Sequence, residues 1–156
     1  MDTSILSWII WIPVIGMAAI ALIPREKVKT IKMVTAVATG IQFLATLGLW
    51  SRFEESNGGF QFMERAEWIP SFNITYILGV DGLSLPMVIL TGLLFFLGTF
   101  VSWNINRAQK GYFALYLLLN TGVMGVFLSL DFFLFYVFWE VMLLPMYFLI
   151  GMWGGP

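Results

Sequence analysis

The chain has 156 residues, of which 60% are hydrophobic and only 11% are charged, and its net charge at pH 7 is -1. Soluble domains carry about 25% charged residues, so this composition excludes an ordinary soluble protein and indicates an integral membrane protein. The few basic residues form no cluster of the kind that binds nucleic acid. The sequence contains no Cys and no His. Those residues supply most ligands of haem, iron–sulfur clusters and zinc, so we expect no redox centre or metal site in this chain.

Five apolar stretches are long enough to cross a membrane, which takes about 20 residues. They are residues 3–24, 33–51, 82–106, 111–130 and 132–155, with an outer loop at 52–81. The first stretch lacks the basic start and the small-residue cleavage site of a signal peptide, so we expect it to be retained. The sequence therefore predicts an all-α integral membrane protein, with five transmembrane helices in one membrane domain.

The distribution of basic residues predicts the orientation of these helices. Six basic residues lie in the two short connections, at Arg25, Lys27, Lys29, Lys32, Arg107 and Lys110, against Arg52 and Arg65 in the long connection. Cytoplasmic loops carry an excess of Lys and Arg. We therefore expect the N-terminus and the 51–81 segment outside and the short loops in the cytoplasm.

The outer segment contains signals for a short β-hairpin. The turn-forming Asn57-Gly58-Gly59 precedes FQFM at 60–63 and FNITYIL at 72–78, and Pro70 separates the two runs. The runs are compatible with paired strands. An irregular loop lying on the neighbouring helices is the alternative.

Two aspartates precede apolar stretches. Asp81 stands before GLSLP, and Asp131 stands before the fifth stretch. Asp is a favoured residue at helix N-termini, so we expect both to cap helices at the membrane boundary. For Asp81, an entry point for cations is the alternative interpretation.

Glu140 interrupts the apolar run FYVFWEVMLLPMYFLI at 135–150. It lies about 13 Å below the outer boundary of its helix, close to the bilayer midplane. A charged side chain there costs about 3 kcal/mol on insertion scales, so such residues normally have partners and mark functional sites. Glu140 is therefore the leading functional candidate. A permanently protonated acid that donates one hydrogen bond between helices is the alternative.

Other polar groups share the fifth stretch with Glu140. Tyr136 lies four residues before it and Tyr147 seven residues after it, so both phenols fall on its face of a helix. Pro145 cannot donate a hydrogen bond to the Val141 carbonyl. The freed carbonyl invites a kink or a water molecule; a purely shape-determining proline is the alternative.

Asn120 and Thr121 interrupt the middle of the fourth stretch. In an antiparallel helix pair that turns near 130–131, Asn120 and Glu140 share the same depth. A contact between them depends on the rotation of each helix. An amide that joins neighbouring helices is the alternative role for Asn120.

Two long segments of the chain closely resemble one protein family. They are WIPSFNITYILGVDGLSLPMVILTGLL at 68–94 and FLSLDFFLFYVFWEVMLLPMYFLIGMWGG at 127–155. They resemble the antiporter-like M subunits (chain 4) of NADH:quinone oxidoreductase, respiratory complex I. A weaker form of the pattern is shared by related subunits of that complex and of multisubunit cation/proton antiporters.

The resemblance implies the N-terminal part of an inverted-repeat, proton-translocating membrane subunit. It implies that the essential buried glutamate of the family is Glu140, and we take Asn120, Tyr136 and Tyr147 as supporting candidates. In the family, this glutamate pairs with a lysine on a later broken helix. The chain stops at Gly-Gly-Pro before such a helix. We therefore expect a fragment, or a chain whose remainder is supplied separately.

The resemblance also implies where the chain works and with what. NADH, FMN, iron–sulfur clusters and quinone are expected elsewhere in the complex, with none in this chain. The implied partners are other membrane-arm subunits, including neighbouring antiporter-like subunits, and the lipid bilayer of the bacterial inner membrane. A structural membrane module with a neutral glutamate, or a subunit of a cation/proton antiporter, is the alternative function.

Overall fold

The computed structural model describes residues 5–52, 61–69, 71, 74–104 and 109–153. Within them the chain forms α1 (Ile5–Ala21), α2 (Val28–Arg52), β1 (Gln61–Ile69), β2 (Ile74–Val80), α3 (Ser84–Val101), the short 3-10 helix η2 (Ser102–Asn104), α4 (Gln109–Leu128) and α5 (Phe132–Trp153). The predicted count of five membrane helices is confirmed. By length and composition four of them can cross a membrane, and α1 is a shorter apolar helix.

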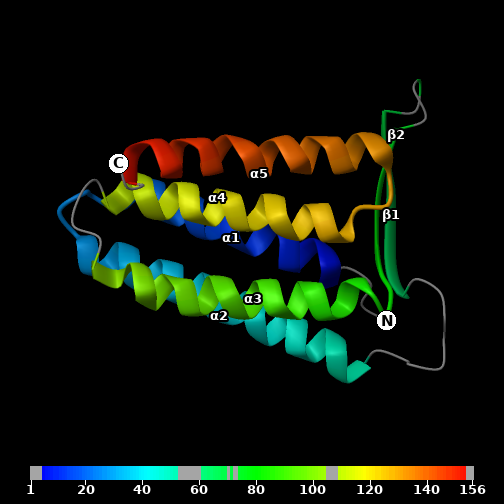
Figure 1. The fold of residues 1–156 in the computed structure, drawn as a ribbon, viewed down its shortest axis with the longest axis horizontal. Helices are drawn as coiled ribbons and strands as arrows, with labels where there is room; N and C mark the ends of the chain where they lie inside the picture. Colours follow the sequence, from blue (N-terminus) through cyan, green and yellow to red (C-terminus); the bar gives the residue numbers. More distant parts are fainter. Residues whose placement is uncertain (1–4, 53–60, 70, 72–73, 105–108, 154–156) are drawn as a thin grey trace.

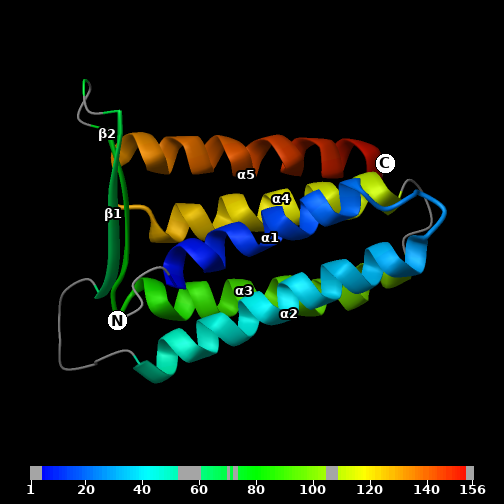
Figure 2. The same cartoon turned by 180° about the vertical axis from the view of Figure 1, so that it is seen from behind.

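The helices run alternately in opposite directions and pack side by side (Figures 1 and 2). Helix α1 packs against α2 and α4, and α3 packs mainly against α2. Helix α5 lies at one edge of the bundle, beside α4 and farthest from α2 and α3 (Figures 1 and 2). Only 17% of its apolar window is buried, compared with 44% for α4. Most of the surface of α5 is therefore uncovered by the described residues.

The bundle buries polar side chains and exposes apolar ones. Buried polar residues are Thr35, Thr39, Gln42, Thr46, Thr91, Thr99, Asn120 and Thr121, whereas large apolar side chains such as Val37, Ile41, Leu44, Leu90, Leu94 and Leu97 are exposed. A soluble protein rarely exposes so much contiguous apolar surface. In a bilayer this arrangement is favourable, because lipid solvates the apolar side chains and polar groups seek partners inside. The chain is a multi-pass membrane protein.

A two-stranded antiparallel sheet adds β-structure to the predicted all-α fold. Strand β1 pairs with β2 in a register that includes Arg65 opposite Ile77. The sheet crosses the end of the bundle where α5 begins (Figures 1 and 2). Between α4 and α5, the Leu130 amide donates to the Ile77 carbonyl at 2.9 Å. The predicted hairpin is therefore confirmed, with a first strand that extends beyond the predicted run to Ile69, while Asn57-Gly58-Gly59 lies outside the described residues.

The largest differences from the predicted spans are at the start of α2 and at the end of α3. Helix α2 begins at Val28, although the apolar window starts at 33. Lys29 and Lys32 fit in its first turns because their long side chains can extend toward water from a helix that projects beyond the bilayer. Helix α3 ends at Val101, where the backbone tightens into η2, so the apolar window to 106 exceeds the helix.

Asp81 and Asp131 cap the helices that follow them. One Asp81 carboxylate oxygen accepts hydrogen bonds from the backbone amides of Leu83 at 3.1 Å and Ser84 at 2.9 Å. Asp131 does the same for Phe133 at 2.8 Å and Leu134 at 3.0 Å. These bonds satisfy amides that have no partner inside the helix. The capping interpretation is confirmed for both residues.

The cap at Asp81 predicts a pH dependence of stability. Its pKa is lowered, chiefly because the carboxylate accepts the Ser84 amide hydrogen bond. A lowered folded-state pKa gives stability that is fully present above the unfolded value of about 4 and is lost as the pH falls through the folded value. In detergent titrations at pH 7, Asp81→Ala should lose about 1 kcal/mol of unfolding free energy. Asp81→Asn should retain the cap and lose less stability than wild type on acidification to pH 3; equal acid sensitivity would contradict this role.

Candidate functional site

Helix α5 approaches α4 closely because two glycines of α4 leave room for it. A Cβ on Gly122 would lie 2.5 Å from the Met142 backbone nitrogen and 2.7 Å from its Cα, and a Cβ on Gly125 would meet the ring of Phe138. Phe138 and Leu134 are buried on this side of α5. Small residues let membrane helices approach in this way. This contact sets the rotation of α5.

The predicted stripe of Tyr136, Glu140 and Tyr147 lies on the opposite side of α5. Glu140 is exposed, and Tyr136 and Tyr147 are 56% and 73% exposed. Tyr136 lies one helical turn before Glu140, so its hydroxyl stands on the same face as the carboxylate. The stripe therefore faces away from α4, and nothing in the described part of the chain covers it.

Pro145 lies inside α5, on the buried side of the helix. Since proline has no amide hydrogen, the Val141 carbonyl receives no helical bond from it. The Val141 carbonyl carbon packs against α4, where a Cβ on Gly122 would lie 2.9 Å from it, so this carbonyl lies on the α4 side of α5 and away from the exposed Glu140 face. The middle of α5 thus carries a carboxylate and a phenol on its exposed side and the proline-interrupted carbonyl on its buried side.

Asn120 lies in the core of the bundle, where it pairs with Gln42 of α2. Each amide nitrogen donates to the oxygen of the other side chain at 2.9 Å. Both side chains are fully buried. Asn120 points away from α5, because Gly122 faces that helix and residues two apart lie on nearly opposite sides of a helix. Asn120 and Glu140 are therefore not brought together, and Asn120 joins helices instead.

A proline in α1 completes this buried cluster. Pro13 leaves the Ile9 carbonyl without its helical donor, and Gln42 Nε2 donates to that carbonyl at 2.7 Å. Thr121 Oγ1 donates to the neighbouring Ile10 carbonyl at 2.8 Å. Side chains of α2 and α4 thus satisfy the interrupted backbone of α1, as polar groups in a membrane interior require.

Gln42 was absent from the sequence-based candidates. It belongs to a polar stripe along α2, formed by Thr35, Thr39, Gln42 and Thr46, all of which are fully buried. Their spacing of three to four residues places them on one helix face, and this periodicity was visible in the sequence. The identification of transmembrane windows relied on the absence of charge and therefore passed over uncharged polar residues.

The Gln42–Asn120 pair predicts a measurable energetic coupling. Gln42→Leu or Asn120→Leu leaves one buried amide without its partner, whereas the double variant removes both groups. In a double-mutant cycle in detergent, we expect a coupling of about 0.6–1.7 kcal/mol in unfolding free energy. Thr91→Val, which removes a hydroxyl bonded only within α3, is the control and should show no coupling to Asn120. Additive losses at Gln42 and Asn120 would contradict the pairing.

The residues of this site can take part in proton transfer and hydrogen bonding. Among the described residues, no three His, Cys, Asp or Glu side chains come together as a metal site. A carboxyl group binds and releases a proton, and a phenol both donates and accepts hydrogen bonds. The Tyr136–Glu140 pair is therefore suited to holding or passing a proton near the middle of the bilayer.

Comparison with known proteins gives concordant relatives. No family model matches the chain. NADH-quinone oxidoreductase subunit M of Escherichia coli is 40% identical over 162 residues, covering 96% of this chain and 31% of the relative. NAD(P)H-quinone oxidoreductase chain 4 1 of Synechococcus elongatus is 38% identical, covering 97% and 28%. A chain of respiratory complex I from Thermus thermophilus with bound NADH superposes with a TM-score of 0.79 at 26% identity, covering 97% of this chain and 30% of that chain.

These similarities extend over nearly the whole chain, and the fold and the sequence point to the same relatives. They do not extend over the whole of those relatives, because this chain spans less than a third of their length. The chain is therefore a homologue of subunit M, or chain 4, of the NADH:quinone oxidoreductases.

Proposed function

We propose that this chain forms part of a proton-translocating membrane subunit of an NADH:quinone oxidoreductase, in which Glu140 carries the proton. The observation that supports this proposal most is the placement of a carboxylate at mid-span on the uncovered face of α5. A carboxylate in contact with lipid at that depth is unfavourable by about 3 kcal/mol. Further protein against this face would remove that penalty.

The length of the relatives supports a covering by further protein. They are about three times as long as this chain, so they contain more helices than the five described here. In the proposed arrangement, later helices pack against α5 and enclose Glu140. The lysine partner of the family would come from that region. Enclosure turns the stripe into a lined passage that can hold water.

Each polar group has a role in the proposed passage. Glu140 accepts a proton from one side and releases it to the other. Tyr136 donates a hydrogen bond to the ionised carboxylate and accepts one when the carboxyl is protonated. The Tyr147 hydroxyl, on the same face of α5, can bind waters that continue the hydrogen-bonded chain. The Gln42–Asn120 cluster holds α1, α2 and α4 together, so that α4 presents a fixed surface to α5.

Oxidation of NADH and reduction of quinone are assigned to other subunits. The sequence has no Cys or His with which to bind an iron–sulfur cluster or haem. NADH, FMN, iron–sulfur clusters and quinone therefore belong elsewhere in the proposed complex. Its partners are other membrane-arm subunits, including neighbouring antiporter-like subunits. The direct test is Glu140→Gln in the assembled complex, which should stop proton translocation while NADH oxidation by an artificial acceptor continues.

We further propose a bacterial inner-membrane location with the N-terminus outside. Arg25, Lys27, Lys29, Lys32 and Lys110 gather where α1 ends and where α2 and α4 begin, while Arg107 lies outside the described residues. The opposite end carries the sheet and the caps of α3 and α5. An excess of basic residues favours the cytoplasmic side.

Single cysteines test this orientation, because the chain has none of its own. Lys29 and Leu83 are exposed at opposite ends of the bundle. In intact cells, a membrane-impermeant maleimide should label Leu83→Cys but should label Lys29→Cys only after lysis. Labelling of Lys29→Cys alone in intact cells would invert the topology.

A further inference from the structure

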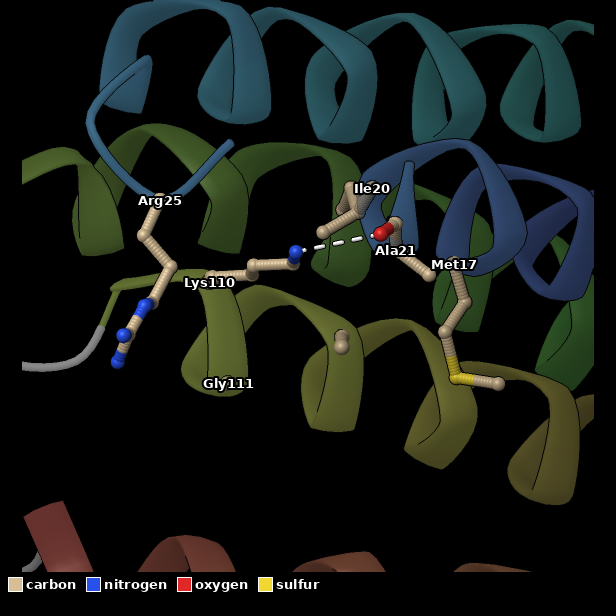
Figure 3. A pocket seen from close by; sticks show the side chains of 7 residues that line it. Met17, Ile20, Ala21, Arg25, Lys110 and Gly111 are labelled. Atoms are coloured by element: carbon tan, nitrogen blue, oxygen red, sulfur yellow. Dashed lines mark hydrogen bonds between the residues drawn. The ribbon is translucent and has the colours of Figure 1, made fainter. Parts of the chain in front are cut away.

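A cavity of about 600 Å³ opens at the basic end of the bundle, between the end of α1 and the start of α4. Its lining consists of Met17, Ile20, Ala21, Arg25, Lys110, Gly111 and Ala114. Figure 3 shows Arg25 entering from the α1–α2 connection and Lys110 from the first turn of α4. Two cations thus border a cavity whose other walls are uncharged.

The two kinds of lining residue are separated along the membrane normal. Met17 precedes Ala21 by one helical turn, and Ala114 follows Lys110 by one turn, so the apolar wall reaches about 6 Å deeper than the cations. The basic rim therefore lies at the boundary of the membrane and the apolar wall lies inside it. This order matches a phospholipid, with an anionic headgroup outside and acyl chains within.

The surrounding charge adds to the attraction for anions. At the same end of the bundle, Lys27, Lys29 and Lys32 add to the two lining cations, against one carboxylate at Glu26 among the described residues of this end. Lys110 also donates to the Ala21 carbonyl at 3.2 Å (Figure 3), which holds its ammonium group at the cavity and ties α4 to the end of α1. An ammonium has three donor hydrogens, so this bond leaves others for a phosphate.

We propose that this cavity binds an anionic phospholipid, with its phosphate between Arg25 and Lys110 and the first carbons of an acyl chain against Met17, Ile20 and Ala114. Basic pockets between membrane helices on the cytoplasmic side are suited to anionic headgroups. The occupant is a lipid rather than free phosphate because the cavity continues into apolar walls that free phosphate would leave uncovered. This site is independent of Glu140 and of the proposed proton path.

The test is native mass spectrometry of the full chain in detergent micelles, with phosphatidylglycerol and phosphatidylcholine as probes. Wild type should retain phosphatidylglycerol about tenfold better than the zwitterionic lipid. Arg25→Gln should weaken phosphatidylglycerol retention about fivefold, the effect of removing one basic residue at a membrane surface. Ala114→Phe, which fills the apolar part without changing charge, should weaken it at least as much. Lys110 is left unchanged in this test because its hydrogen bond to the Ala21 carbonyl also joins α4 to α1.

Lys29→Gln is the matched control, because Lys29 is an exposed cation of the same end that does not line the cavity. Its lipid retention should stay within twofold of wild type. Equal losses for Lys29→Gln and Arg25→Gln would overturn the site in favour of diffuse attraction. Equal retention of both lipids, an unaltered Ala114→Phe variant, or displacement of the lipid by millimolar inorganic phosphate would also overturn it. Circular dichroism confirms that each variant tested is folded.

Discussion

Replacing Glu140 by glutamine in the assembled complex should reduce proton translocation, and the quinone reduction coupled to it, by at least tenfold. Glutamine has nearly the same size and forms similar hydrogen bonds, but it cannot bind and release a proton. Proteoliposomes with a pH-sensitive dye report proton translocation, and quinone reduction is followed in parallel. Electron transfer from NADH to a soluble artificial acceptor should remain normal, since no redox centre is assigned to this chain.

Two variants separate a proton-carrying role from general damage to α5. Asp131→Asn alters a carboxylate of the same helix but keeps the cap, because asparagine caps helices as well as aspartate does, so its effect should be small. Tyr136→Phe removes the hydroxyl beside Glu140 and should lower the rate less than loss of the carboxyl group. A normal proton gradient at a normal quinone reductase rate in Glu140→Gln would refute the proposed function.

The same experiment distinguishes the proton path from a purely structural role for Glu140. A neutral glutamic acid that only joins helices can be replaced by glutamine, since an amide also donates and accepts hydrogen bonds. In that case Glu140→Gln would assemble and translocate protons normally, whereas Glu140→Leu would impair assembly. The proton path predicts instead that Glu140→Gln assembles normally but does not translocate protons.

The helices could be predicted from the sequence because few backbone conformations are possible in lipid. A membrane span must satisfy its own backbone hydrogen bonds, so each long apolar stretch becomes a helix. The caps at Asp81 and Asp131 were equally local, because each depends on amides two and three residues further along the chain. Features of this kind depend only on neighbours in sequence.

The rotation of each helix did not follow from the sequence. Equal depth predicted a possible meeting of Asn120 with Glu140, yet Asn120 pairs with Gln42. The deciding contact is the passage of the Met142 backbone over Gly122, which turns Glu140 to the far side of α5. Such contacts depend on how two surfaces fit together, and a pattern within one helix does not contain that information.

The buried cluster at Pro13 shows how neighbouring helices supply a hydrogen bond that a proline removes from a helix backbone. A proline in the middle of α1 frees a carbonyl, and Gln42 supplies the missing donor. Pro145 creates the same defect in α5, near Glu140. The carbonyl freed by Pro13 receives its hydrogen bond from a side chain of the described bundle. The carbonyl freed by Pro145 lies on the side of α5 that packs against Gly122 of α4, opposite the Glu140 face.

The close contact of α4 with α5 gives the last prediction, because Gly122 tolerates no side chain. The Cβ of Gly122→Ala would lie 2.5 Å from the Met142 nitrogen and 2.7 Å from its Cα, and these atoms belong to a helix backbone that cannot rotate away. Helix α5 must therefore move as a body. Overpacking of this kind costs about 1–3 kcal/mol, more than the gain of about 1 kcal/mol from replacing glycine by alanine in a helix.

Gly48→Ala is the matched control, since Gly48 is also helical and a Cβ there meets nothing within 4 Å. In detergent unfolding, Gly48→Ala should leave the unfolding free energy unchanged or raise it by up to about 1 kcal/mol, whereas Gly122→Ala should lower it and Gly122→Val should lower it further. In the assembled complex, Gly122→Val should also impair proton translocation, because displacing α5 moves Glu140 with it. If Gly122→Ala matches Gly48→Ala in stability, α5 does not pack on α4 at this position, and the outward rotation of Glu140 that depends on this contact is wrong.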